Sequence, residues 1–354
     1  MQTNDILAQM EISSTHPFSR AFDHASNHIG LRFQNPLYKI TELFTGSTFR
    51  SSLADVKRFG RDIVRNARKR RAQAAFESLI TQDDSDASSS GGGENSRFGN
   101  LIDSLMETFE NPTIVADAAL NFLSAGRDTT AQSLTWTLYA LLRNPEVLPK
   151  LRREIDQVFS GAEKRIPRDD HIKSEITISS LQPLSLPYTM ATFHESLRLY
   201  PPVPIEIKQT LRPLTLPDGT SLPTDAVVVW CIWALNRSET TFGPDAARFR
   251  PERWIDGQGK LVRRSEAEYP VFNGGPRACL GKKMAEVLAC WVLGMVLAEF
   301  EFVEAAGLDG VRVVEGEERK KGSGGVCIVE RVSANSLTLP MEGGLPCRVR
   351  MRAR

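Results

Sequence analysis

The apolar residues in the middle of the chain follow a helical repeat. Within Asn111–Arg143, Leu134, Leu138 and Leu141 recur three or four residues apart. An asparagine suits the cap of a first turn, and the proline after it suits the first helical position. The pattern therefore predicts one long helix that ends before the next Asn-Pro pair.

Three further helices follow from the same kind of pattern. Apolar residues between Val147 and Val158 share one face, and a helix from about Tyr188 to Tyr200 ends at a Pro-Pro pair. The apolar run Val287–Ala298 is well short of the roughly 20 residues that cross a bilayer. It predicts a buried core helix.

Short alternating segments predict a small β portion. Leu214–Leu216 and Ser221-Leu222 flank a Pro-Asp-Gly turn and predict a hairpin, and Val227–Trp230 predicts a further strand. Ser336–Leu339, before Glu342-Gly343-Gly344, predicts a terminal hairpin. The expected fold class is mainly α with a small β portion.

Two polar segments are expected to lie on the surface. Residues 82–97 include three serines followed by three glycines, a composition too polar to pack, so a disordered loop is predicted there. The basic run Arg68–Arg71 is interpreted as a solvated helix face rather than a targeting or nucleic-acid patch.

Composition narrows the function classes only slightly. The 354 residues are 41% hydrophobic and 25% charged, as in ordinary globular proteins. The formal net charge of +1 gives no field that would attract nucleic acid, so no nucleic-acid partner is expected. The five cysteines show no CxxC spacing, which argues against a disulfide framework or a zinc site. The first 18 residues lack the features of a signal peptide.

The segment with the sharpest chemistry is a glycine-rich loop that carries one cysteine to the start of an apolar helix. Cys279 at such a helix start is favoured as a thiolate, which is a soft anionic ligand for iron. Gly275 and Gly281 allow the backbone to approach a flat cofactor, Arg277 can pair with a carboxylate on it, and Phe272 can cover one side. A lone cysteine is usually a small buried hydrophobe. A nucleophilic cysteine would need a histidine base, and none lies in a recognisable motif.

A second motif interrupts the long helix. Ala125–Thr130 places small residues before an acid and two hydroxyls, and a mid-helix glycine costs about 1 kcal/mol. Asp128 and Thr129 can hydrogen-bond bound oxygen and relay protons. The alternative is a threonine that bonds back to a helical carbonyl.

Charged residues further along predict a structural ion network. Glu195 and Arg198 stand three apart on one helix face, and Arg253 lies in a proline-punctuated loop. If the three meet in the interior, removal of one should cost about 3 to 5 kcal/mol.

The chain carries four such segments, in the order Ala125–Thr130, Glu195 to Arg198, Pro251–Arg253 and Phe272–Gly281. In this order they resemble those of a cytochrome P450, a heme-thiolate monooxygenase. The family's cysteine signature is matched at Phe272, Gly275, Arg277, Cys279 and Gly281, its oxygen-activation motif at Ala125–Thr130, its Glu-x-x-Arg motif at Glu195 and Arg198, and its Pro-Glu-Arg motif at Pro251–Arg253. The wording of the motifs is similar to the fungal branch that hydroxylates alkanes and fatty acids. The resemblance covers 1–354 as one domain, the carboxyl-terminal two-thirds of a family member.

The resemblance implies one heme b (iron protoporphyrin IX) with Cys279 as the axial ligand to iron. It implies a reaction that consumes molecular oxygen and two electrons from an NADPH-dependent cytochrome P450 reductase, with cytochrome b5 as an additional donor. One oxygen atom would enter a hydrophobic substrate such as a fatty acid, an alkane or a secondary metabolite. An intact family member would lie on the endoplasmic reticulum membrane.

Two departures from the family pattern qualify this expectation. Lys208 stands where the branch has an arginine that pairs with a heme propionate, so the charge is kept and the bidentate fork is lost. The anchor and the front of the family fold are not found before residue 18, which predicts an N-terminally truncated product. An inactive heme-binding fragment is therefore one alternative. A heme-thiolate isomerase or dehydratase is another, although that chemistry does not need Asp128 and Thr129.

Overall fold

The computed structural model describes most of the chain in two compact units, divided between Ala125 and Gly126. The described residues are 17–32, 35–82, 100–163, 183–305, 313–315, 329–334, 336 and 338–353. Except for Gln82, which ends a helix, the loop predicted at 82–97 lies outside them. The single domain expected over 1–354 stays a prediction.

The first unit is helical. It contains α2 (Pro17–Arg32), α3 (Tyr38–Thr45), α4 (Ser47–Gln82), α5 (Leu101–Thr108) and the start of α6 (Pro112–Arg143). Phe18 of α2 stacks on Phe59 of α4 with ring centroids 4.1 Å apart, and Val64 packs with Val115 in a small core. Arg68–Arg71 lies on an exposed part of α4, as predicted.

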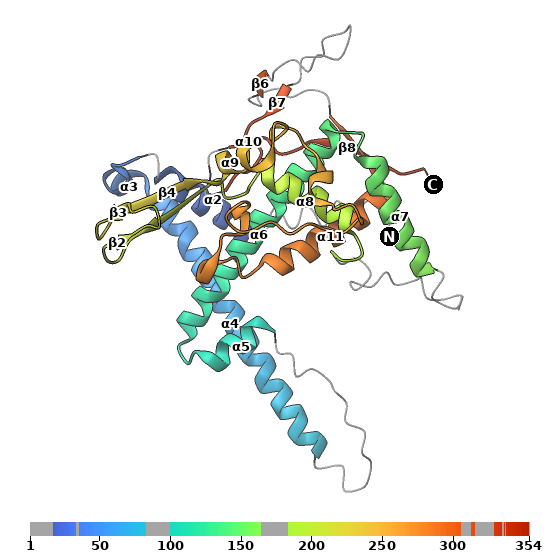
Figure 1. Ribbon diagram of the computed structural model, residues 1–354. Helices are drawn as coiled ribbons and strands as arrows, with labels where there is room; N and C mark the ends of the chain where they lie inside the picture. Colours follow the sequence, from blue (N-terminus) through green and yellow to red (C-terminus); the bar gives the residue numbers. More distant parts are fainter. Residues whose placement is uncertain are drawn as a thin grey trace. The chain divides into compact units, whose positions relative to one another are not determined.

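The second unit holds the main core. Its helices are α6 from Gly126 onward, α7 (Leu148–Glu163), α8 (Pro187–Leu199), α9 (Ile232–Leu235), α10 (Glu239–Phe242) and α11 (Lys282–Glu299) (Figure 1). Short 3-10 turns lie at Pro251–Trp254, Pro270–Phe272 and Gly275–Arg277. From Thr189 to Leu199 every residue of α8 is buried. Leu151 of α7, Phe193 of α8 and Leu293 of α11 belong to one apolar cluster. The predicted helices at 111–143, 147–158 and 188–200 and the buried helix after Cys279 are confirmed.

Helix α8 begins against α7 rather than on a cap of its own. Leu186, at the cap position, offers no side-chain hydrogen bond. The carboxylate of Glu154 instead accepts from the backbone N–H groups of Tyr188 at 2.7 Å and Thr189 at 2.8 Å. Two of the N–H groups that a helix start leaves without helical partners are thereby satisfied, which fixes α8 on α7.

Eight short strands form four two-stranded antiparallel sheets within the described residues. The pairs are β1 (Ile205–Gln209) with β4 (Val227–Cys231), β2 (Leu214–Thr215) with β3 (Ser221–Leu222), β5 (Phe300–Glu304) with β8 (Cys347–Met351), and β6 (Val313–Glu315) with β7 (Val329–Arg331). The first hairpin and the strand near 227–230 agree with prediction.

The predicted terminal hairpin is wrong. Among the described residues of that region, Leu339 donates its N–H to the carbonyl of Pro202 at 3.0 Å, and the last strand, β8, pairs with β5 instead. Phe302 of β5 is partly buried and packs against the main core, a contact that local turn signals cannot reveal. As for membrane spans, none of the described helices combines the length and apolarity needed to cross a bilayer.

Candidate active site

The loop before α11 presents Cys279 at the surface. Its backbone is shaped by two left-handed residues, Asn273 with φ of 56° and Gly275 with φ of 62°. The N–H of Cys279 donates to the carbonyl of Phe272 at 2.7 Å, and the N–H of Ala278 donates to the carbonyl of Gly275 at 3.0 Å. The loop is therefore closed by its own backbone, and the thiol is held outside the core.

The surroundings of the thiol fit a flat apolar cofactor. Cys279 is exposed, and Leu280 and Met284 beside it are 82% and 63% exposed, which is unusual for large apolar side chains so close together. A side chain at Gly275 would meet no atom within 4 Å but would be strained by the positive φ, and a Cβ at Gly281 would lie 3.9 Å from the Cys279 Sγ. Glycine at both positions leaves the sulfur open to a bulky group.

Phe272 lies behind this loop, half buried. Its ring stands edge-on to His194 of α8, with centroids 6.4 Å apart, and the Lys282 ammonium lies 5.4 Å from its centre. These contacts hold the ring between α8 and the start of α11. Phe272 can therefore shield the sulfur side of a cofactor bound at Cys279.

Two cations are available for carboxylates on such a cofactor. In the part of the chain that the structure describes, the exposed guanidinium of Arg277 has no hydrogen-bond or ion-pair partner. Lys208, exposed on β1, lies 5.2 Å from the centre of the Trp230 ring on β4. Both are exposed basic side chains that could pair with propionates. No measured contact joins Lys208 to the cysteine loop among the described residues.

Asp128 and Thr129 lie half buried on α6. The Asp128 carboxylate pairs with Arg127 at 3.1 Å, and the Thr129 carbonyl accepts from the Ser133 hydroxyl at 2.6 Å. This motif approaches α11, the helix that follows Cys279, at Gly126. A Cβ at Gly126 would lie 3.7 Å from the Met284 Cε. The pairing of Arg127 with Asp128 was not predicted from the sequence.

The three residues of the predicted ion network meet in the core. The carboxylate of Glu195 is 2.8 Å from the Arg198 Nε and 2.9 Å from the Arg253 Nε, and Glu195 and Arg198 have no exposed surface. The same carboxylate accepts from the Trp254 indole at 2.9 Å and the Arg250 backbone N–H at 2.8 Å. With the Arg198 Nη2, which donates at 2.9 Å, five donors converge on Glu195.

The hydrogen-bond donors of Arg198 are also fully used. It makes two bonds to Glu195 and three to the carbonyls of Asn236, Ala246 and Arg248, at 2.7, 2.6 and 2.9 Å. All five of its N–H donors are thus used. The network ties α8 to the 236–254 segment that precedes the cysteine loop.

Asp245 is a fourth member of the network that the sequence did not reveal. Its carboxylate lies 3.3 Å from Arg253 and 3.0 Å from Arg250, and these arginines hold its pKa below the usual range against the opposing effect of burial. It balances the second buried cation, so the network is close to neutral. The signal available in the sequence, an acid eight residues before Arg253, is too common to be recognised.

A buried histidine next to the network was also missed. The Nδ1 atom of His194 is 3.3 Å from the Tyr269 hydroxyl, and its Nε2 is 3.5 Å from the Glu286 carboxylate. Burial, assisted by Lys282, lowers the pKa of His194 to about 3, and burial raises the pKa of Glu286. The histidine is therefore neutral at physiological pH, and its contact with Glu286 is not an ion pair.

Comparison with known proteins identifies the family. The family model described as Cytochrome P450 matches residues 7–314. The chain belongs to the cytochrome P450 family, and its mainly helical fold with small sheets is the fold expected from the motifs. Members of this family carry heme b, and the residues around Cys279 fit that cofactor.

Curated relatives come from plants and fungi. Cytochrome P450 94A1 of Vicia sativa is 32% identical over 302 residues, which cover 82% of this chain and 52% of that protein. Cytochrome P450 monooxygenase cyp1 of Mycosarcoma maydis is 30% identical over 363 residues, or 99% of this chain and 51% of that protein. Cytochrome P450 52A3-B of Candida maltosa is 32% identical over 297 residues, or 81% and 51%. The chain spans about half the length of these relatives.

Proposed function

We propose that this chain supplies the heme-thiolate site of a monooxygenase that inserts one atom of molecular oxygen into a hydrophobic organic substrate. The observation that carries the proposal is the exposed thiol of Cys279, held by the closed backbone of its loop among exposed apolar side chains. Fatty acids, alkanes and hydrophobic secondary metabolites are the substrate classes that the motif resemblance favours.

Each residue of the site has a task in this function. Heme b, when bound, supplies the oxygen chemistry, for which a thiolate ligand is well suited. Cys279 would hold the iron, while Arg277 and Lys208 would pair with the propionates. Phe272 shields the sulfur from water. Gly275 and Gly281 let the backbone approach the ring closely.

The motif Ala125–Thr130 on α6 would supply protons to the reaction. The carboxylate of Asp128 and the hydroxyl of Thr129 are hydrogen-bonding groups that can hold a proton near the site of oxygen binding. The half-buried Arg127 guanidinium lies 3.1 Å from the Asp128 carboxylate and would orient it. Both groups therefore support an oxygen-consuming reaction over isomerisation or dehydration.

We propose further that the electrons come from an NADPH-dependent cytochrome P450 reductase, with cytochrome b5 as an additional donor. The complete enzyme would then act at the endoplasmic reticulum membrane, where such a reductase resides. This part rests on family membership and on the monooxygenase named in Mycosarcoma maydis.

The test is a reduced, carbon monoxide-bound difference spectrum of the purified chain after addition of heme. A strongly red-shifted Soret band is expected for the wild type, and Cys279→Ala should abolish it. Cys347→Ala, which removes another thiol from strand β8, should keep it. A band that persists in Cys279→Ala would refute Cys279 as the ligand, and a wild type that binds no heme would refute the proposed heme site in this chain.

A further inference from the structure

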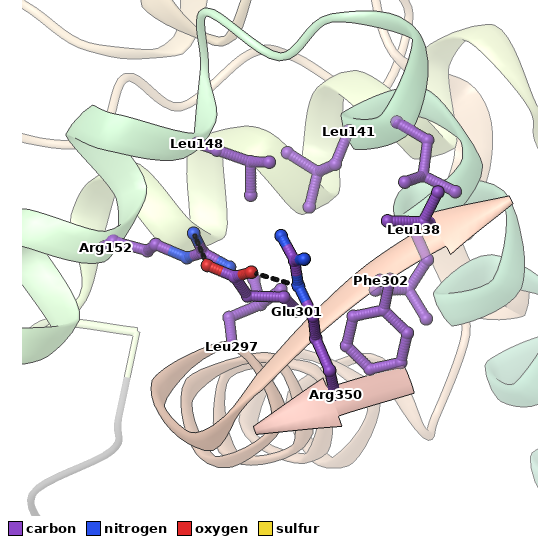
Figure 2. A pocket seen from close by; sticks show the side chains of 10 residues that line it. Leu138, Leu141, Leu148, Arg152, Leu297, Glu301, Phe302 and Arg350 are labelled. Carbon is purple, nitrogen blue, oxygen red and sulfur yellow. Dashed lines mark hydrogen bonds and ion pairs between the residues drawn. The ribbon is translucent and has the colours of Figure 1, made fainter. Parts of the chain in front are cut away.

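A small pocket opens between α6, α7, the end of α11 and the β5–β8 sheet, at residues that no part of the proposed heme site uses. Its walls are mostly apolar, and its volume is about 120 Å³. The apolar lining is Leu138, Leu141, Leu142, Leu148, Leu297, Phe302 and Val303. Figure 2 shows leucines of α6 and α7 on one side of the pocket and a charged cluster facing them (Figure 2).

The charged cluster has one cation more than it has anions. Glu301 lies between Arg350, whose Nε is 2.7 Å from its carboxylate, and Arg152, whose Nη1 is 3.7 Å away (Figure 2). Because one carboxylate faces two guanidinium groups, the cluster carries a net charge of +1. The surplus belongs to Arg152, since its contact with Glu301 is the longer one.

Arg152 also has unused hydrogen-bonding capacity. Its Nη2 donates to the Phe300 carbonyl at 3.3 Å, a long bond, and its Nε is buried without a partner in the described part of the chain. The side chain is 20% exposed, so its charge is only partly screened by water. A buried donor of this kind is costly unless something accepts from it.

We propose that this pocket binds a small amphiphilic monocarboxylate. The apolar tail would lie among the leucines, and the carboxylate would accept from Arg152 and neutralise the surplus charge. A dry apolar cavity of about 150 Å³ holds a benzene molecule, so the tail that fits has about four to six carbons or one ring. A longer apolar tail would extend beyond the pocket into solvent.

The first experiment compares three probes by ligand-observed NMR titration of the purified chain. Hexanoate has both features, 1-hexanol lacks the charge, and acetate lacks the tail. Hexanoate is expected to bind at least about tenfold more tightly than either. Equal binding of acetate would overturn the proposal in favour of surface anion binding, and equal binding of hexanol would overturn it in favour of a purely apolar occupant.

Variants then test the site. Arg152→Gln should weaken hexanoate binding about tenfold and leave hexanol unchanged, whereas Arg152→Lys should retain most of the affinity. Arg153→Gln is the matched control, because this exposed neighbour on α7 does not line the pocket. Leu148→Phe should weaken hexanoate and hexanol alike by filling the cavity. Hexanoate binding that Arg152→Gln leaves unchanged in a folded protein would refute the assignment.

Discussion

Replacing Glu195 by glutamine would test the buried ion network with almost no change in shape. The side chain accepts five hydrogen bonds, three of them from the guanidinium groups of Arg198 and Arg253. Glutamine keeps one acceptor oxygen and turns the other position into an amide NH₂ that faces arginine donors. Glu195→Gln therefore removes a buried charge and creates donor–donor contacts at one step.

The magnitude follows from the burial of the partners. Arg198 has no exposed surface and the side chain of Arg253 is 2% exposed, so solvent cannot replace the lost carboxylate. Only Asp245 remains to balance the two cations, at 3.3 Å from Arg253. Breaking a buried pair by removal of one partner costs about 3 to 5 kcal/mol, and we expect Glu195→Gln to fall in this range.

Urea unfolding followed by circular dichroism would measure the loss. The matched control is Glu252→Gln, in the Pro251–Trp254 turn, because Glu252 also pairs with a cation, Lys150, at 2.6 Å, but is 43% exposed. The control should lose less than about 1 kcal/mol. If both variants unfolded at the same urea concentration, the buried network would not contribute more to stability than an exposed ion pair.

Two further predictions concern residues around the candidate site. Because the pKa of His194 is lowered to about 3 from an ordinary value of 6.5, the unfolded chain binds a proton that the folded chain does not. The folded state should therefore lose stability as pH falls from about 6.5 toward 3, by about 2 kcal/mol between pH 7 and pH 5, and His194→Gln should remove this loss in urea titrations at several pH values. A slope that the variant retains would contradict the assignment. Lys208→Arg should slow heme loss to apomyoglobin because a guanidinium binds a propionate through two bonds, while the exposed Lys260→Arg should change nothing. Equal rates for wild type and Lys208→Arg would count against a propionate contact.

The sequence predicted elements whose signals are local. Helices α6 and α8 could be predicted because the spacing of their apolar residues and the signals for their starts and ends lie within short stretches of sequence. The pairing of β5 with β8 joins residues 47 or more positions apart, from Glu304 to Cys347 onwards, and no turn signal marks it. Register of that kind is decided by burial, which only the folded chain reveals.

The same distinction applies to the candidate site. The cysteine loop and the Glu195 network were found because several unusual residues stand at fixed spacings. Asp245, Trp254 and His194 carry no such pattern, yet each contacts the network or the ring of Phe272. Their roles depend on where α8 is buried, so composition and spacing could not have assigned them.

The five donor bonds of Arg198 also bear on how freely this part of the chain can be redesigned. Lysine has the same charge but only three donors, so at least two of the five hydrogen bonds that Arg198 makes to carbonyl and carboxylate oxygens would be lost. We therefore expect most substitutions at position 198 to destabilise the fold, because no other side chain supplies five donors in this geometry. Variation aimed at new catalysts is better directed at positions such as Leu280 and Met284, whose side chains are largely exposed and take no part in a buried hydrogen-bond network.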